Sequence, residues 1–129
     1  MGQPAAKKGD RIEGKDNHLV KFPNGVVSMM PLDFKAIISD KVSPNVKIMG
    51  AAAATEGSAG KNQPEHKLML APGQDFVIQP NNEGKIVKGS KTVRINGKPA
   101  ARSGDDADTC HDAPGAPPKV VATGSVLIG

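Results

Sequence analysis

One segment of this chain occurs twice at a constant offset of 47 residues, and a third copy is divided between the two chain ends. Residues 41–58 and 88–105 align without a gap, and eight of the 18 aligned pairs are identical. The first half of the unit returns at residues 124–129 and the second half at residues 2–10. Three copies that close into a circle predict a compact body with approximate threefold symmetry and adjacent termini, because a solenoid would instead extend between capped ends.

Each copy of the unit has the pattern of a β-hairpin. Asn96-Gly97 predicts a two-residue type I′ turn, since both positions of that turn require positive φ. Small Ala residues follow, which suits hairpins that converge on a narrow axis. The predicted fold class is all-β, a small conical arrangement of three hairpin repeats in which the two termini close the third. Before each turn, apolar side chains recur at every second position, the period of a half-buried strand: Val46 and Ile48, Val93 and Ile95, Val126 and Ile128.

Three segments leave a choice of structure. Residues 51–54 are four consecutive Ala, which by propensity alone favour a helical turn, but their register with residues 99–101 favours a strand. The insertion at 29–40 predicts a short amphipathic helix that starts near Pro31. The insertion at 67–87 predicts a loop around one strand, or a hairpin. Neither insertion suggests a function.

The composition limits how such a chain can hold itself together. Its 129 residues are expected to form a single domain over 1–129. One Cys excludes an internal disulfide, and three Phe without Trp or Tyr predict a small apolar core. We find no apolar run of membrane-spanning length and no secretory signal peptide, so we expect synthesis and folding in the cytoplasm. Something other than a large core must therefore stabilise the fold.

The order of motifs in the unit, Gly-Ser, Val-x-Ile, Asn-Gly, Pro-Ala-Ala-Arg and Gly-Asp, resembles that of the PAAR-repeat family. Residues 99–102 carry the tetrapeptide intact, residues 4–7 have Lys in place of Arg, and residues 52–55 lack both its Pro and its Arg. The resemblance implies the sharpened tip of a contractile injection machine such as a type VI secretion system. It also implies a trimeric β-helical spike of the VgrG type as partner and one bound zinc ion.

All His and Cys residues of the chain occupy related places in the repeat. His18 and His66 each follow the end of their copy by eight positions, while Cys110 and His111 follow the end of theirs by five and six. The segments that follow the three copies would bring these residues to one point on the axis, where three imidazoles and one thiolate complete a tetrahedral zinc site. The family resemblance implies the same ligand set. Because neighbours in an extended strand point to opposite faces, both Cys110 and His111 ligate only if the backbone there is irregular.

The sequence predicts a function without catalysis. A zinc ion with four protein ligands has no open position for a substrate, and no catalytic triad or carboxylate pair is apparent. The positive residues behind the net charge of +4 are dispersed along the sequence without Tyr or Trp for stacking, which disfavours nucleic acid as a partner. We therefore expect a zinc-stabilised tip that caps one spike trimer, aids penetration of a target envelope with transient membrane contact, and offers attachment to effector proteins.

Two other functions stay open on the sequence alone: a free-standing zinc-dependent binding module and a small zinc hydrolase. A stable trimeric partner would exclude the first, and a metal-bound water would favour the second. We expect the tip to be made in the cytoplasm without a signal peptide and to be delivered, with the injection apparatus, outside the cell or into a target cell. The sequence does not distinguish a type VI system from a phage tail or an extracellular injection device.

Overall fold

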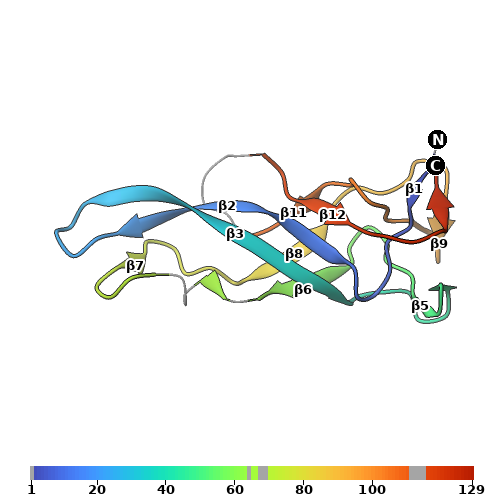
Figure 1. Ribbon diagram of the computed structural model, residues 1–129, viewed down its shortest axis with the longest axis horizontal. Helices are drawn as coiled ribbons and strands as arrows, with labels where there is room; N and C mark the ends of the chain where they lie inside the picture. The colour runs from blue at the N-terminus through green and yellow to red at the C-terminus, as the bar shows by residue number, and fades with distance from the viewer. Residues whose placement is uncertain (1, 64, 67–69, 111–115) are drawn as a thin grey trace.

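The computed structural model describes residues 2–63, 65–66, 70–110 and 116–129, and its regular elements in these ranges are β-strands. Long strands run along the molecule, and short strand pairs gather at the end where both termini lie (Figure 1). Within the described part of the chain, no helix is long and apolar enough to cross a membrane. The all-β class predicted from the sequence is confirmed.

The larger sheet has seven strands and curls until its two edges meet. Its strands are β2 (Arg11–Lys21), β3 (Val27–Asp40), β6 (Ala59–Asn62), β7 (Asp75–Phe76), β8 (Glu83–Ile86), β11 (Ala107–Asp108) and β12 (Lys119–Val121). Their order is β11-β8-β6-β3-β2-β12, with β7 paired to β2. Asp106 and Lys119 form an antiparallel bridge between the edges, and the Ala107 N–H donates to the Pro118 carbonyl at 2.9 Å. The sheet therefore encloses an interior.

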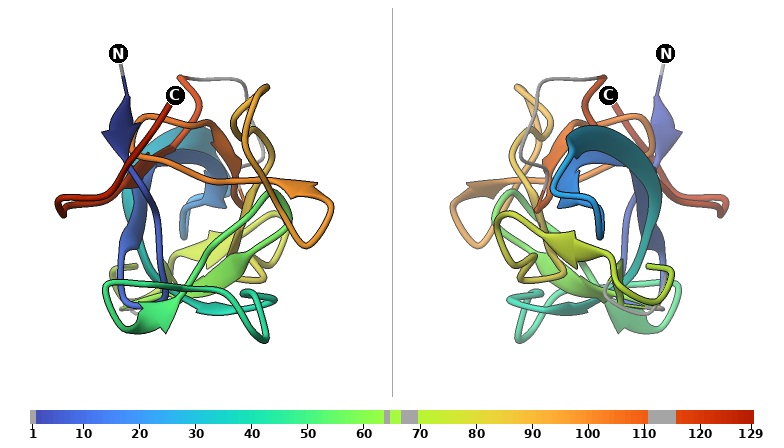
Figure 2. Two further views of the ribbon diagram at one scale, coloured as in Figure 1. Left: turned by 90° about the vertical axis from the view of Figure 1, so that its right-hand side faces the viewer. Right: turned by 90° about the vertical axis from the view of Figure 1, so that its left-hand side faces the viewer.

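Three two-stranded pairs lie beside the larger sheet: β1 (Gln3–Pro4) with β13 (Leu127–Ile128), β4 (Lys47–Ile48) with β5 (Ala51–Ala52), and β9 (Arg94–Ile95) with β10 (Lys98–Pro99). They project in different directions when this end faces the viewer (Figure 2, left). Both central residues of the two turns, Met49-Gly50 and Asn96-Gly97, have positive φ, so the predicted turn geometry is confirmed. The pairing of β1 with β13 joins the chain ends, as the split repeat predicts.

We call residues 2–9, 41–57, 88–104 and 123–129 the hairpin end. A ring of backbone hydrogen bonds holds it together. The Ala6 N–H donates to the Ala101 carbonyl, the Ala101 N–H to the Ala54 carbonyl, and the Ala54 N–H to the Ala6 carbonyl, each at 3.0 Å. All three side chains are fully buried. Only small residues allow three backbones to approach this closely, which explains why the repeat carries Ala pairs here.

Buried apolar side chains form three clusters along the molecule. The cluster at the hairpin end contains Ile48, Ile95 and Ile128. The central cluster is built around Phe34, and the far cluster contains Phe76 from β7. The candidate functional residues described below lie between the central and far clusters.

The Val residues predicted to share the interior face of each hairpin behave differently from the Ile residues. Ile48, Ile95 and Ile128 are buried, but Val93 and Val126 are 37% and 41% exposed. The prediction was wrong for these two Val residues. The strands are only two residues long here, so each hairpin places one large side chain in the small end cluster and leaves the Val at its open rim.

The helix predicted for residues 29–40 is wrong, because these residues belong to β3. From Leu32 to Ile38, buried and exposed side chains alternate without interruption, which is the period of a strand. All eleven residues of β2 pair with β3 and so supply its backbone partners. Pro31, taken as a helix start, lies within the strand opposite Asn17.

The insertion at 67–87 contributes two strands that do not pair with each other. β7 pairs with β2, whereas β8 lies between β6 and β11. Neither the predicted single strand nor the predicted hairpin describes this segment fully, because its two strands have different long-range partners. Residues 67–69 of this insertion lie outside the described residues. At residues 51–54 the strand prediction is confirmed, since Ala51–Ala52 form β5.

Candidate metal centre

Strand β2 supplies two neighbouring side chains with metal-binding atoms. Asp16, His18 and Val20 are each 0% exposed. Because side chains two positions apart share one face of a strand, Asp16 and His18 lie next to each other inside the curled sheet. The Phe76 ring meets the His18 ring edge to face, with centroids 5.2 Å apart. The far apolar cluster therefore covers this side of the group.

His66 enters the same interior from the segment after β6, and Asn82 holds it in place. The His66 backbone N–H donates to Asn82 Oδ1 at 2.8 Å. Asn62 Nδ2 donates to the same oxygen at 3.3 Å, while Asn62 Oδ1 accepts from the Lys35 backbone N–H at 2.8 Å. Asn82 has a φ of 56°, a left-handed conformation that Asn tolerates better than most residues. These polar contacts hold the backbone of His66 in position and so direct its side chain into the interior.

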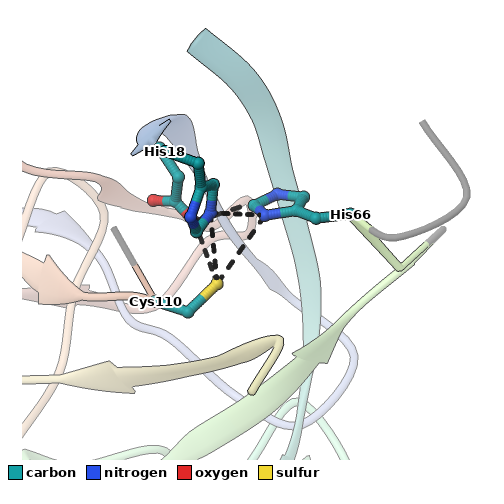
Figure 3. A group of neighbouring side chains, drawn as sticks. His18, His66 and Cys110 are labelled. Atoms are coloured by element: carbon teal, nitrogen blue, oxygen red, sulfur yellow. Dashed lines mark hydrogen bonds and ion pairs between the residues drawn. The ribbon is translucent and has the colours of Figure 1, made fainter. Parts of the chain in front are cut away.

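Cys110 completes a compact group with the two histidines (Figure 3). His18 Nε2 lies 2.8 Å from His66 Nδ1, and Cys110 Sγ lies 3.8 Å and 3.7 Å from these two atoms. Asp16 Oδ2 lies 3.3 Å from the sulfur, and the Thr109 hydroxyl donates to Asp16 Oδ1. One ligand atom from each of Asp16, His18, His66 and Cys110 lies within 4.8 Å of all the others. A carboxylate, two imidazoles and a thiol thus converge on one buried point.

Burial sets the protonation of this group when no metal is bound. It raises the pKa of the Cys110 thiol to about 12, and the negative charge of Asp16 adds to the effect. Burial also lowers the pKa of His66, against the opposing attraction of Asp16. At neutral pH the metal-free group therefore contains a protonated thiol that donates to Asp16, and a neutral His66.

The separations between the sulfur and the two imidazole nitrogens are compatible with a tetrahedral ion such as zinc. With ordinary zinc–ligand bond lengths, such a site has N–S edges of about 3.6 Å and N–N edges of about 3.3 Å. The two N–S separations, 3.8 Å and 3.7 Å, agree with this geometry. The imidazole nitrogens, 2.8 Å apart, would separate slightly to share a cation in place of their hydrogen bond. A bound cation would also stabilise the thiolate and offset the cost of burying the Asp16 carboxylate.

The structure brings together three of the four residues predicted as ligands: His18, His66 and Cys110. The fourth, His111, lies outside the described residues. Asp16 was not predicted, although the sequence contains a signal for it. It precedes His18 by two positions, so any strand that turns His18 inward also turns Asp16 inward, where a carboxylate needs a partner.

The curled sheet and its buried group of metal-binding side chains define a small all-β protein with a candidate metal centre. The family model for the PAAR motif matches residues 78–129, which confirms the resemblance seen in the repeat: this chain contains a PAAR motif. Searches among curated proteins and among solved structures gave no match. A PAAR motif implies a component of the type VI secretion apparatus that lies at the spike tip and binds a VgrG protein. Proteins of this family are generally structural and not enzymatic.

Proposed function

We propose that this protein is a zinc-stabilised, non-enzymatic tip that caps one trimeric VgrG-type spike of a contractile injection machine. The observation that carries the proposal is the PAAR motif at residues 78–129. In this proposal the three hairpins are pseudo-threefold repeats of a conical fold, and the two termini close the third. One chain then offers three similar edges to a partner with true threefold symmetry.

Backbone contacts that recur in all three hairpins support this arrangement. Each hairpin closes with an equivalent bond of 2.9 to 3.0 Å: the N–H of Ala5 to the carbonyl of Val126, Ala53 to Val46, and Ala100 to Val93. Each hairpin also forms one bridge to the next: Lys7 with Ala53, Thr55 with Ala100, and Arg102 with Ala5. Because these contacts run around a circle, the three units support one another equally.

The proposed metal is a single structural zinc ion held by His18, His66 and Cys110, with the fourth position filled by Asp16 or by the sequence-predicted His111. When bound, zinc supplies a cross-link between strand β2 and two distant segments and favours the Cys110 thiolate. The chain's own side chains bind and orient the ion between the Phe34 and Phe76 clusters. Four protein ligands leave no position for a nucleophilic water, which favours this structural role over a zinc hydrolase.

In this function the protein is made in the cytoplasm and leaves it with the spike. During injection the tip meets the target membrane only transiently, and it offers attachment to effector proteins. Co-expression with the VgrG-type spike of the same genome, followed by native mass spectrometry, tests the assembly. We expect one tip for three spike chains. Three tips per spike trimer would contradict the symmetry argument, and a free tip beside an intact trimer would instead favour a free-standing binding module.

A further inference from the structure

The hairpin end carries most of the positive charge of the molecule. It contains nine of the 17 Lys and Arg residues but only one of the 13 Asp and Glu residues. Its net charge is therefore +8, whereas the rest of the chain, which includes the larger sheet, has a net charge of −4. The modest net charge of the whole protein conceals two parts of opposite sign.

Ion pairs neutralise only part of this positive charge. Three pairs join the hairpin end to neighbouring carboxylates: Lys7 with Asp10 at 3.1 Å, Arg102 with Asp105 at 3.1 Å, and Lys88 with Asp106 at 3.5 Å. Six further cations are exposed and have no ion pair with any described residue: Lys8, Lys41, Lys47, Lys91, Arg94 and Lys98. They come from all three copies of the repeat, so the charge surrounds the hairpin end.

Exposed apolar side chains accompany these cations. Met49, in the turn after β4, is 58% exposed, and Leu127, in β13, is 60% exposed. Val93 and Val126 add two smaller exposed apolar side chains on two of the hairpins. Glu56 is the single acidic residue of this end. Apolar contacts surrounded by cations suit a protein partner that presents apolar and acidic side chains.

We propose that the hairpin end docks on an acidic, partly apolar end of the spike trimer. The inference rests on the proposed function and adds the chemistry of the partner surface. Opposite charges at the two parts of the tip would orient its approach, because an acidic spike end attracts the hairpins and repels the larger sheet. A nucleic acid would also attract the cations but would leave Met49 and Leu127 without apolar partners. An acidic protein surface with apolar side chains would contact both the cations and the exposed apolar residues of this end.

Charge reversal at matched positions tests the inference. Lys47 and Arg94 occupy equivalent places in β4 and β9, and both are exposed. The double variant Lys47→Glu/Arg94→Glu should associate with the purified spike trimer about tenfold more slowly at low salt, and the difference should shrink as salt screens the charges. The control Lys21→Glu/Lys35→Glu changes net charge equally at two exposed positions of the larger sheet. It should slow association much less, because its two changed positions lie on the larger sheet and not on the docking surface. Zinc content and the thermal midpoint verify folding of both variants.

The outcomes separate the two proposals. If the parent protein forms no complex with the spike, the proposed function fails. If the parent binds but both variants behave alike, the spike-tip function stands and the acidic docking surface is overturned. A DNA duplex serves as the third arm of the experiment. Salt-sensitive binding to DNA that the Lys47→Glu/Arg94→Glu variant loses, together with unchanged spike binding, would assign the basic end to nucleic acid and also overturn the inference.

Discussion

His18 Nε2 and His66 Nδ1 lie 2.8 Å apart although 48 residues separate them in the sequence. The His18 ring also meets Phe76, and the His66 ring meets Phe34 with centroids 6.1 Å apart. Two imidazoles are thus pressed together between aromatic rings that leave little space for water. Without a metal, one ring donates to the other; with a cation between them, both lone pairs turn to the ion.

Replacing either histidine should remove zinc and stability together. We expect His18→Ala and His66→Ala to lower the zinc content from about one ion per chain to nearly none, as expected for a closed four-ligand site. The thermal midpoint should fall by roughly 5 °C or more, since loss of the ion costs at least a few kcal/mol. Elemental analysis and thermal unfolding measure both. Ser28→Ala, at an exposed position of β3, is the control and should change neither.

Asp16 should contribute to zinc affinity. Asp16→Asn keeps the shape of the side chain but removes its charge, and we expect zinc to bind about 10- to 100-fold more weakly, measured by competition with a chelator. Cobalt(II) substitution then helps to identify the ligand, because the loss of a coordinating group changes the visible spectrum of the ion strongly. The same pair of measurements on His111→Ala assigns or excludes that residue. Unchanged zinc affinity in Asp16→Asn would remove Asp16 from the centre.

Asn82 should matter for metal binding although it offers no ligand atom to the cluster. Asn82→Ala removes the acceptor of the His66 backbone N–H and of Asn62 Nδ2, leaving buried donors unpaired. We expect a loss of about 1–3 kcal/mol in the free energy of unfolding and weaker zinc binding. Asn81→Ala is the matched control, because Asn81 is exposed and accepts only a local bond from Glu83. Equal effects of the two substitutions would argue against a positioning role.

The metal-free protein should lose stability at alkaline pH. The pKa of the Cys110 thiol is raised from its ordinary value of 9.0 to about 12 in the folded protein. As the pH rises, the thiol of the unfolded chain therefore loses its proton before the thiol of the folded protein does. The contribution of Cys110 to the free energy of unfolding is complete below about pH 9 and is lost as the pH rises toward 12. Urea unfolding at pH 8 and pH 10.5 should show the decline in the metal-free parent and a smaller one in Cys110→Ser. Zinc-loaded protein, whose thiol is already deprotonated, should lack this contribution.

The last six residues should be indispensable. Deleting 124–129 removes β13, including the buried Ile128, and the Gly129 carbonyl that accepts from Ser90 Oγ at 2.5 Å. We expect the truncated protein to unfold or to lose spike binding. Joining Gly129 to Gly2 through a short linker and opening the chain within the 67–87 insertion should be tolerated, because the ends already lie side by side. A truncated protein as stable as the parent would contradict the circular arrangement.

Sequence reasoning succeeded where structure depends on local residue types. Asn96-Gly97 predicts its turn through backbone conformation alone, and the repeat transfers that prediction to Met49-Gly50 despite the different first residue. The closure of the larger sheet was not predicted, because β8, β11 and β12 are short and pair over long distances. Their sequences contain no pattern that specifies a partner.

The grouping of the candidate metal-binding side chains was predicted in part for a related reason. The positions of His18 and His66 in the repeat could be compared directly, but the repeat does not mark Asp16. Finding it required knowing that residues 11–21 form a strand with His18 on its inner face. The positive charges also look dispersed in the sequence. They gather in space because the chain returns to the same end with each copy of the repeat.

The ring formed by Ala6, Ala54 and Ala101 has a kinetic consequence. Hairpins β4–β5 and β9–β10 can close within microseconds, because their partners are adjacent in the chain. The ring cannot close this fast, because the Ala6 N–H must reach the distant Ala101 carbonyl. The hydrogen bonds from Ala6 to Ala101 and from Ala101 to Ala54 can form only after Ala101 has been synthesised. Folding governed by such distant contacts is slow. During synthesis, the first copy of the motif therefore has no partners until the later copies have been made. A nascent chain cannot dock on a spike before its last repeat has left the ribosome.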